Sequence, residues 1–310
     1  MSSIALLGNF EVPFSTESEL RWTLETRLGH RFTPLQENKV TAQEVVQKCR
    51  ETATKLLIWV HTHGWDVQGD LQWMLNQLRA SGIKTASFHL DRFWGLNILD
   101  QRQDRIGTHA FWRTDKVFTA DGGNDEKFAA LGINHVWMPP AVVERDCALG
   151  RPNLQFNCPV AFFGADGYHP EHPFRARMIS RLREKYGTNF RVYQGIRQQA
   201  LNDAYATVKV LVGDHCFAGA SPRYWSDRLP ETLGRGGFLI YPETEGLEVP
   251  GLATYEGQNA DDLIKKIDYW LDDDRNQERI RRRNEAHEYV KQHHTYTQRM
   301  QQLLQVMGVQ

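Results

Sequence analysis

Short apolar runs alternate with amphipathic segments along most of the chain. The apolar runs stop at small or polar residues, as residues 4–7 stop at Gly8-Asn9, and leucines spaced by four residues predict helices between them. The predicted strands are residues 4–7, 55–60, 85–90, 116–119, 135–138, 160–163, 190–193, 208–212 and 238–241. The predicted helices are residues 17–28, 70–80, 124–131, 174–186, 198–206 and 261–271, with a long charged helix from about residue 276 to the C-terminus.

This order of elements indicates the fold class. Strands that alternate with helices across short Gly- and Asp-rich turns are typical of a parallel sheet with helices on both faces. The pattern pauses at the polar stretch 151–159, which suits a linker, and then restarts. We therefore predict an α/β protein of two doubly wound halves of similar size. In such sheets ligands bind outside the carboxyl ends of the strands, so the natural site is the cleft between the halves.

Composition and charge narrow the class of protein. A chain of 310 residues exceeds one comfortable hydrophobic core, which agrees with two domains. A formal net charge of −1 argues against a protein that coats nucleic acid by bulk electrostatics. Four widely spaced cysteines without a C-x-x-C pair indicate reduced thiols. No apolar run approaches the roughly 18 residues that cross a bilayer, and the N-terminus lacks the basic start of a signal peptide, so we expect a soluble, cytoplasmic protein.

Several cofactor and metal motifs are absent from the sequence. The loop after the first strand lacks G-x-G-x-x-G, no G-x-x-x-x-G-K-[ST] occurs, and the histidines lack the H-E-x-x-H spacing. Residues 219–223 do not form the G-x-S-x-G of a hydrolase. We interpret His169 and His172 as surface histidines, and we expect no cofactor and no metal ion.

The segment from residue 210 to 240 carries the most chemical information. It predicts a strand, a polar loop, a short helix with Pro230 in its first turn, a Gly-Gly turn and another strand. The start of such a helix favours a phosphate, and Arg223 and Arg228 flank it as a possible bidentate clamp. Glu231 lies one step into the helix, where it would accept hydrogen bonds from a ribose diol. Together these features describe a site for a nucleoside diphosphate.

The same segment resembles the C-terminal half of GT-B glycosyltransferases, in the group-1 and CgeB-like (spore-maturation-protein-like) branches. These share a pattern of the type S-x-R-x-x-E-x-x-x-x-G-G, which is represented here by Ser226, Arg228, Glu231, Gly236 and Gly237. Residues 160–164, 204–210 and 294–300 also resemble parts of that half, so the resemblance covers about residues 155–310. It departs at Arg223, where many group-1 enzymes carry a first Glu.

The resemblance implies two Rossmann-like domains that face a cleft. Residues 1–152 would bind the acceptor, residues 153–285 would bind the nucleotide sugar, and a helix over 286–310 would pack back on the first domain. By the resemblance, Glu231 would bind the donor ribose and Ser226 and Arg228 the diphosphate. The full set of expected donor-binding residues is Gly8, Gly164, Gln194, Gly195, Asp214, Arg223, Ser226, Arg228 and Glu231. The co-substrate would be a UDP-sugar, with no other cofactor.

The first half offers candidates for catalysis and for the acceptor. Asp91 follows a predicted strand and would deprotonate a hydroxyl if the enzyme inverts configuration, whereas in a retaining enzyme it would orient the substrate. His63 would stabilise the leaving phosphate, and His61 and Asp121 are further acid–base candidates. The expected acceptor-stacking residues are Trp65, Trp94 and Trp112, for each of which packing in the core is the alternative.

The leading hypothesis is therefore a glycosyltransferase that moves a sugar from a nucleotide sugar to a hydroxyl acceptor. The acceptor stays open among a glycan, a protein and a hydroxymethylated base of phage-type DNA. A two-lobed protein that binds a nucleotide or sugar without catalysis is the alternative, and a nucleotide-sugar epimerase is a weaker one. Metal independence is expected, because Arg residues and helix N–H groups would neutralise the leaving diphosphate. The sequence does not predict an oligomeric state.

Overall fold

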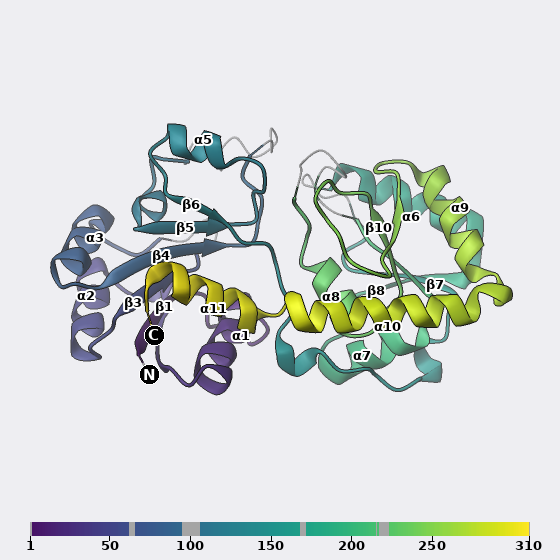
Figure 1. Cartoon of the computed structure of the whole chain (residues 1–310), viewed down its shortest axis with the longest axis horizontal. Helices are drawn as coiled ribbons and strands as arrows, with labels where there is room; N and C mark the ends of the chain where they lie inside the picture. The colour runs from purple at the N-terminus through teal and green to yellow at the C-terminus, as the bar shows by residue number, and fades with distance from the viewer. Residues whose placement is uncertain are drawn as a thin grey trace. The chain divides into compact units, whose positions relative to one another are not determined.

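The structure is a computed structural model that describes residues 2–61, 66–94, 106–167, 172–214, 216 and 223–309. Contacts divide the chain into two compact units (Figure 1). The first unit comprises Met1–Pro139 together with Tyr296–Gln310, and the second comprises Pro140–Thr295. Each unit is built on its own parallel sheet, which confirms the predicted α/β class.

The first unit holds a six-stranded sheet in the order β2-β1-β3-β4-β5-β6, in which all neighbours are parallel. Its strands are β1 (Ser3–Gly8), β2 (Arg31–Gln36), β3 (Leu56–Trp59), β4 (Lys84–His89), β5 (Lys116–Thr119) and β6 (His135–Trp137). Its helices are α1 (Thr16–Trp22), η1 (Thr23–Arg27), η2 (Glu37–Lys39), α2 (Ala42–Glu51), α3 (Leu71–Ala80), η3 (Ala110–Arg113), α5 (Asp125–Ala130) and α11 (Tyr296–Met307). β1 and β3 are buried throughout, as expected for central strands of a parallel sheet covered on both faces.

The second unit holds a five-stranded sheet in the order β11-β10-β9-β7-β8, again parallel throughout. Its strands are β7 (Val160–Phe163), β8 (Phe190–Tyr193), β9 (Val210–Val212), β10 (Leu239–Pro242) and β11 (Ala253–Tyr255). Its helices are η4 (Glu144–Asp146), η5 (Leu154–Phe156), α6 (Pro173–Tyr186), η6 (Gly187–Asn189), α7 (Gln198–Thr207), α8 (Arg228–Gly234), α9 (Ala260–Leu271), η7 (Asp273–Arg275) and α10 (Asn276–His293). The core of this sheet includes the side chains of Val160, Phe162, Val210 and Ile240.

The contacts of residues 140–152 lie with the second unit, whereas we expected this segment at the end of the first domain. A Cβ on Gly234 of α8 would lie 2.8 Å from Val142, so this segment packs tightly against α8. The N–H of Val142 also donates to the carbonyl of His294, at 3.0 Å. These contacts hold the segment in the second unit although its sequence precedes the predicted linker.

The long C-terminal helix that the charge pattern predicts is in fact two helices. α10 ends at His293 and α11 begins at Tyr296, because the fully buried Thr295 forms an isolated β-bridge with Val142. α11 packs against α1 and η1 of the first unit, and the ammonium group of Lys84 donates to the carbonyl of Met307 at 2.5 Å. α11 thus belongs to the first unit, whereas α10 belongs to the second.

None of the helices that the structure describes has the length and apolar character that crossing a bilayer requires.

Candidate functional site

The carboxyl ends of β7 and β9 form the candidate site of the second unit. β8 pairs with one edge of β7 and β9 pairs with the other, so the order of the sheet reverses between β7 and β9. Open α/β sheets bind ligands at such a reversal, outside the carboxyl ends of the strands. Gly164 follows β7 and Asp214 follows β9, and both belong to the predicted donor-binding set.

Asp214 is a buried carboxylate, 1% exposed, surrounded by cationic groups. One oxygen accepts from Arg175 Nε at 3.0 Å and lies 3.0 Å from His172 Nδ1, while the other accepts from Arg228 Nη1 at 2.9 Å. Burial alone would raise the pKa of Asp214. The hydrogen bond with His172 and the charges of Arg228 and Arg175 outweigh it and hold that pKa well below its usual range. Two guanidinium groups thus share one buried carboxylate at the strand ends, and Asp227 is a further negative charge that acts on Arg228.

Arg228 is fixed by contacts on several sides. Its Nε donates to the carbonyl of Phe163 and its Nη1 to the carbonyl of Asp214, both at 3.2 Å. The guanidinium carbon lies 4.8 Å from the centre of the Phe162 ring, a distance typical of a cation–π contact. Burial lowers the pKa of Arg228, but the charges of Asp214 and Asp227, with smaller effects of two tyrosines, together raise it above its usual value.

Gly164 is required beside this guanidinium. Its φ of +144° is a backbone conformation that other residues rarely adopt. A Cβ at this position would also lie 2.8 Å from Arg228 Nη2. The group that lies close to Gly164 in the structure is the Arg228 side chain, and the approach of the donor phosphates that the resemblance implies stays a prediction.

Ser226 belongs to the same cluster but does not cap the helix. Its hydroxyl lies 3.4 Å from the carbonyl of Asp214, and its N–H donates to the hydroxyl of Tyr241 at 3.0 Å. α8 begins at Arg228, and Asp227 is its N-cap residue, without a side-chain capping bond. The structure therefore brings together four of the predicted donor-binding residues: Gly164, Asp214, Ser226 and Arg228.

Glu231 lies one turn further along α8, in a second ionic network. Its Oε2 accepts from Arg235 Nε at 2.6 Å, and the Glu231 side chain is 21% exposed. Arg235 also pairs with Asp146 and donates to Asn202 Oδ1. Burial raises the pKa of Glu231, and the charge of Arg235 opposes that rise. The ribose contact that the resemblance implies for Glu231 stays a prediction.

Gln194 and Gly195 follow β8, at the edge of the sheet beside β7. The Gln194 side-chain amide donates to Asp166 Oδ1 at 3.1 Å, which links the loops that follow β7 and β8. A Cβ on Gly195 would meet nothing within 4 Å, so this position is open. The expectation that the nucleotide base lies here is compatible with that space and stays a prediction.

Arg223 belongs to a different loop. Its φ is +56°, and its N–H donates to the carbonyl of Glu245 at 2.7 Å, in the segment after β10. A Cβ on Gly246 would lie 2.7 Å from Arg223 Cγ, so the side chain packs on that segment. The predicted clamp of Arg223 with Arg228 stays untested, and the structure instead supplies Arg175 as the second guanidinium on Asp214.

The sequence interpretation of His172 as a surface histidine was wrong. Its side chain is only 11% exposed, because it packs beside the Asp214 carboxylate. Its Nε2 also lies 3.6 Å from Cys216 Sγ. His172 and Arg175 escaped the sequence analysis as functional candidates. The sequence does predict a basic helix, residues 174–186, soon after the strand 160–163. It does not show which face of that helix lies against the strand ends.

The predicted site residues of the first unit include Gly8 and Asp91, which make different kinds of contact. A Cβ on Gly8 would lie 2.7 Å from Glu17 Cγ, so this glycine allows close packing at the end of β1. The N–H of the partly buried Asp91 donates to His89 Nδ1 at 3.0 Å. His63 and Trp65 lie outside the described residues.

The two remaining tryptophans of the acceptor prediction pack on the protein. Trp112 is 3% exposed and stacks on Phe128 at 5.7 Å between ring centres, so it belongs to the core and offers no open face to an acceptor. The partly buried Trp94 contacts Phe128 edge-on at 5.6 Å, and the Lys127 ammonium lies 5.5 Å from its ring. The core alternative is therefore correct for Trp112.

Asp121, a further acid–base candidate, holds a loop. It is fully buried, and its Oδ1 accepts the N–H groups of Phe93 and Trp94, each at 2.9 Å. Burial raises its pKa to about 6, against the opposing effect of these hydrogen bonds.

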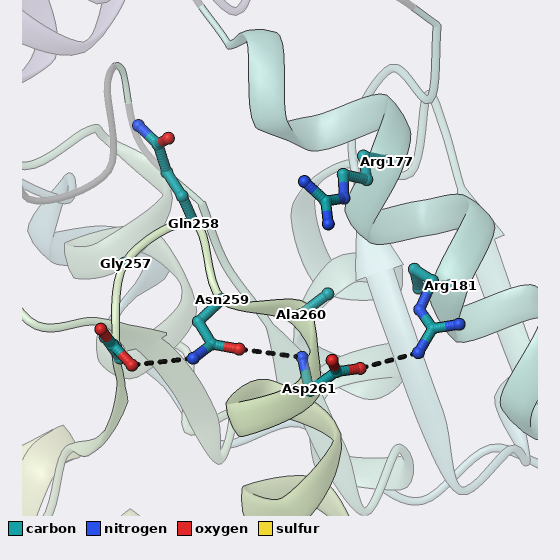
Figure 2. A pocket seen from close by; sticks show the side chains of 8 residues that line it. Arg177, Arg181, Gly257, Gln258, Asn259, Ala260 and Asp261 are labelled. Carbon is teal, nitrogen blue, oxygen red and sulfur yellow. Dashed lines mark hydrogen bonds and ion pairs between the residues drawn. The ribbon is translucent and has the colours of Figure 1, made fainter.

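A pocket of about 460 Å³ lies between α6 and the start of α9 (Figure 2). Arg181 donates there to Asp261 at 2.7 Å, and Asn259 caps α9. None of the predicted donor-binding residues lines this pocket.

Comparison with solved structures identifies the class of fold. A glycosyltransferase from Rickettsia africae aligns with a TM-score of 0.67 at 11% identity, over 99% of this chain and 97% of that chain. Anabaena Alr3699/HepE in complex with UDP and glucose aligns with a TM-score of 0.68 at 10% identity, over 99% and 100%. Sucrose-phosphate synthase from Thermosynechococcus elongatus aligns with a TM-score of 0.63 at 12% identity, over 99% of both chains. The chain therefore has the GT-B fold with two Rossmann-like units, as predicted.

A family model agrees with this class. Residues 162–305, which include the Asp214 cluster and α8, match a family described as "Glycosyl transferase-like". No curated protein matches the chain in sequence. The match spans most of the second unit and of α11, which is less than half of the chain, so it is a similarity of that part.

Proposed function

We propose that this protein is a glycosyltransferase that uses a nucleoside-diphosphate sugar and transfers the sugar to a hydroxyl group. The observation that carries the proposal is the pair of arginines, Arg175 and Arg228, that share the buried Asp214 at the ends of β7 and β9. Buried positive charge at the reversal point of a parallel sheet is suited to an anion. A diphosphate is the anion that the "Glycosyl transferase-like" match favours.

The leaving diphosphate gives these residues their chemical role. When the bond between the anomeric carbon and the diphosphate oxygen breaks, negative charge develops on the distal phosphate. Arg228, already fixed by Phe163, Asp214 and the Phe162 ring, would stabilise that charge without reorganising. This role requires no metal ion, so we propose metal-independent transfer.

The donor nucleotide is proposed to be UDP. Alr3699/HepE, which shares the fold, was solved in complex with UDP, with UDP and glucose and with UDP-glucose. Glu231 would bind the ribose, with Gln194 and Gly195 beside the base. From the sequence alone, we also propose that the protein belongs to the CgeB-like branch and that it is cytoplasmic.

For the acceptor we propose only the reacting group. It is a hydroxyl group on a glycan, a protein or a modified DNA base. Asp91, at the carboxyl end of β4, is the proposed base for an inverting reaction.

Binding and turnover of a UDP-sugar test this function. UDP should raise the melting temperature of the wild type, because it binds the folded state alone. Arg228→Met should bind UDP at least tenfold more weakly, whereas Arg183→Met, which removes a half-exposed guanidinium of the same unit, should bind like the wild type. Glu231→Gln should lower both UDP affinity and the release of UDP from a UDP-sugar.

The outcomes separate the alternatives. UDP binding without UDP release, across a panel of UDP-sugars and acceptors, would favour a binding protein that does not catalyse transfer. Equal UDP affinity of the wild type and Arg228→Met would contradict the proposed donor site.

A further inference from the structure

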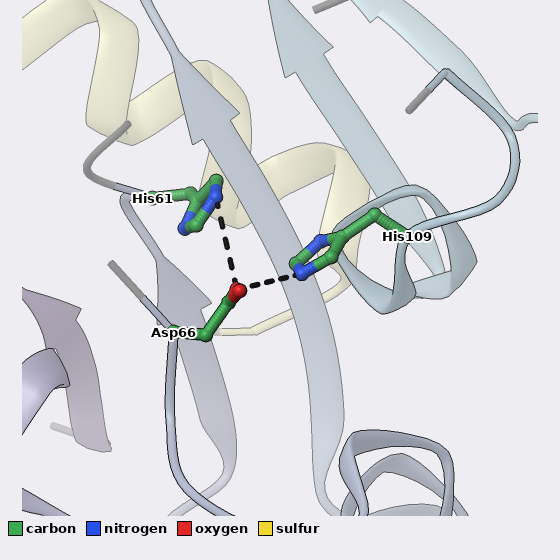
Figure 3. A group of neighbouring side chains, drawn as sticks. All are labelled: His61, Asp66 and His109. Atoms are coloured by element: carbon green, nitrogen blue, oxygen red, sulfur yellow. Dashed lines mark hydrogen bonds and ion pairs between the residues drawn. The ribbon is translucent and has the colours of Figure 1, made fainter. Parts of the chain in front are cut away.

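A second cluster of titratable side chains lies at the reversal point of the first sheet. β2 and β3 pair with opposite edges of β1, so the strand order reverses between β1 and β3. His61 follows β3 at this point. Figure 3 shows Asp66 between His61 and His109: its Oδ1 lies 4.0 Å from His61 Nε2 and 2.7 Å from His109 Nε2. The three ligand atoms all lie within 4.8 Å of one another.

The histidines are buried while the carboxylate is accessible. The side chains of His61 and His109 are 9% and 12% exposed, and their rings stack at 5.0 Å between centres. The side chain of Asp66 is 46% exposed. Two nearly fixed imidazoles therefore face one carboxylate that has room to adjust.

A buried carboxylate fixes the orientation of the first imidazole. Glu37, which follows β2 and is fully buried, accepts from the indole N–H of Trp59 at 2.7 Å. The same oxygen lies 2.6 Å from His61 Nδ1. If His61 Nδ1 donates to this oxygen, the ring lone pair is on Nε2, toward Asp66. Histidines that bind metal commonly have such a carboxylate on their other nitrogen.

We propose that His61, Asp66 and His109 bind a zinc ion. Two imidazole nitrogens and one carboxylate oxygen are a donor set that zinc accepts, and three protein ligands leave a fourth position for water or a hydroxyl group. Tetrahedral zinc with bonds of about 2.0–2.1 Å needs neighbouring ligand atoms about 3.3 Å apart. The distances from Asp66 Oδ1 of 2.7 and 4.0 Å bracket that value, so a small rotation of the Asp66 side chain satisfies both.

Among the described residues, a contact of His109 opposes the ion. His109 Nδ1 accepts the N–H of Phe111 at 3.2 Å, which places the His109 proton on Nε2 in the metal-free protein. Zinc would displace that proton, and protonated Nδ1 would then lose its bond with Phe111. Losing one hydrogen bond of this kind lowers affinity by about tenfold, which is small beside the gain from a third protein ligand.

Zinc binding to tag-free, chelator-stripped protein tests the site directly, by isothermal titration and by the visible spectrum of bound Co²⁺. We expect one equivalent of zinc. His109→Gln and Asp66→Asn should weaken binding by on the order of 100-fold, and Glu37→Gln by about 10–100-fold. The control is His135→Gln, which removes an imidazole paired with a single carboxylate, Asp125, at 2.8 Å in the same unit.

The outcomes decide the proposal without an activity measurement. Asp66 is half-exposed, so Asp66→Asn should fold like the wild type by circular dichroism even if His109→Gln does not. Absence of zinc binding at micromolar zinc, or equal binding by the wild type and Asp66→Asn, would overturn the site. Variants at Asp66 or His109 that lose zinc binding but bind UDP like the wild type would support the zinc site. They would also show that it is separate from the proposed donor site.

Discussion

Replacing Asp214 by asparagine should destabilise the second unit strongly. The carboxylate is 1% exposed, forms ion pairs with Arg175 and Arg228, and lies 3.0 Å from His172 Nδ1. Asparagine has nearly the same size but no charge, so two guanidinium groups would stay buried without a counter-charge. Breaking a buried ion pair in this way costs about 3–5 kcal/mol.

The remaining contacts of Arg228 place the expected value near the lower end of that range. Its bonds to the carbonyls of Phe163 and Asp214 involve the main chain and survive the substitution. The Phe162 ring also stays in contact with the guanidinium. We therefore expect a loss of about 3 kcal/mol from the free energy of unfolding, and a fall in melting temperature on the order of 10 °C.

The matched control is Asp166→Asn in the same unit. The Asp166 side chain is 35% exposed and pairs with Arg183 at 2.7 Å, so its loss should cost less than about 1 kcal/mol. Urea unfolding followed by circular dichroism measures both variants. A loss for Asp214→Asn no larger than that for Asp166→Asn would refute the assignment of Asp214 as the counter-charge of the cluster.

The pH dependence of stability in the wild type and in Asp214→Asn tests whether the charge of Asp214 causes this loss. The folded pKa of Asp214 lies below its unfolded value, so its contribution to stability is fully present above about pH 4. It is lost as the pH falls further, through the folded pKa. The difference between wild type and Asp214→Asn should therefore stay constant from pH 7 to pH 5 and shrink only below about pH 4.

Two further substitutions test other parts of the structure. Gly164→Ala should destabilise the second unit by roughly 1–3 kcal/mol in urea unfolding, because φ at this position is +144° and the added Cβ would meet Arg228. The control is Gly167→Ala, whose Cβ would meet nothing within 4 Å, so its stability should change little. Asp121→Asn tests the pKa of about 6. The folded wild type binds more protons than the unfolded chain between about pH 4 and 6, so its stability should fall as the pH rises through this window. Melting temperatures of Asp121→Asn should lack that fall, and an unchanged slope would contradict the raised pKa.

Much of the fold was predictable because buried parallel strands have continuous apolar sequences. β1, β3 and β7 are buried over all or nearly all of their length and follow directly from that pattern. β2 was missed because it is an edge strand with an irregular pattern of exposure and a proline, Pro34. The following helix, α2, was also missed, although the capping box of Thr41 and Glu44 was a usable signal.

The site was predictable only where it depends on strand ends. Gly164 and Asp214 follow β7 and β9, and parallel strands bring their carboxyl ends to one edge. The partners of Asp214 were not predictable, because His172 and Arg175 lie at the start of α6 and their positions depend on how that helix packs on the sheet. The proximity of His61 and His109 was equally hidden, because these residues lie far apart in the sequence.

The proposed donor site gives the Asp214 cluster a reason that stability alone does not. Buried ion pairs are often no more stable than well-packed apolar residues of the same volume, so stability alone gives little reason to bury two arginines here. Arg175 and Arg228 share the Asp214 carboxylate, and the exposed Asp227 is close enough to raise the pKa of Arg228. The fold places these guanidinium groups beside Gly164, where parallel sheets bind ligands. Fixed guanidinium groups at this point are what the proposed donor site would need to bind a diphosphate.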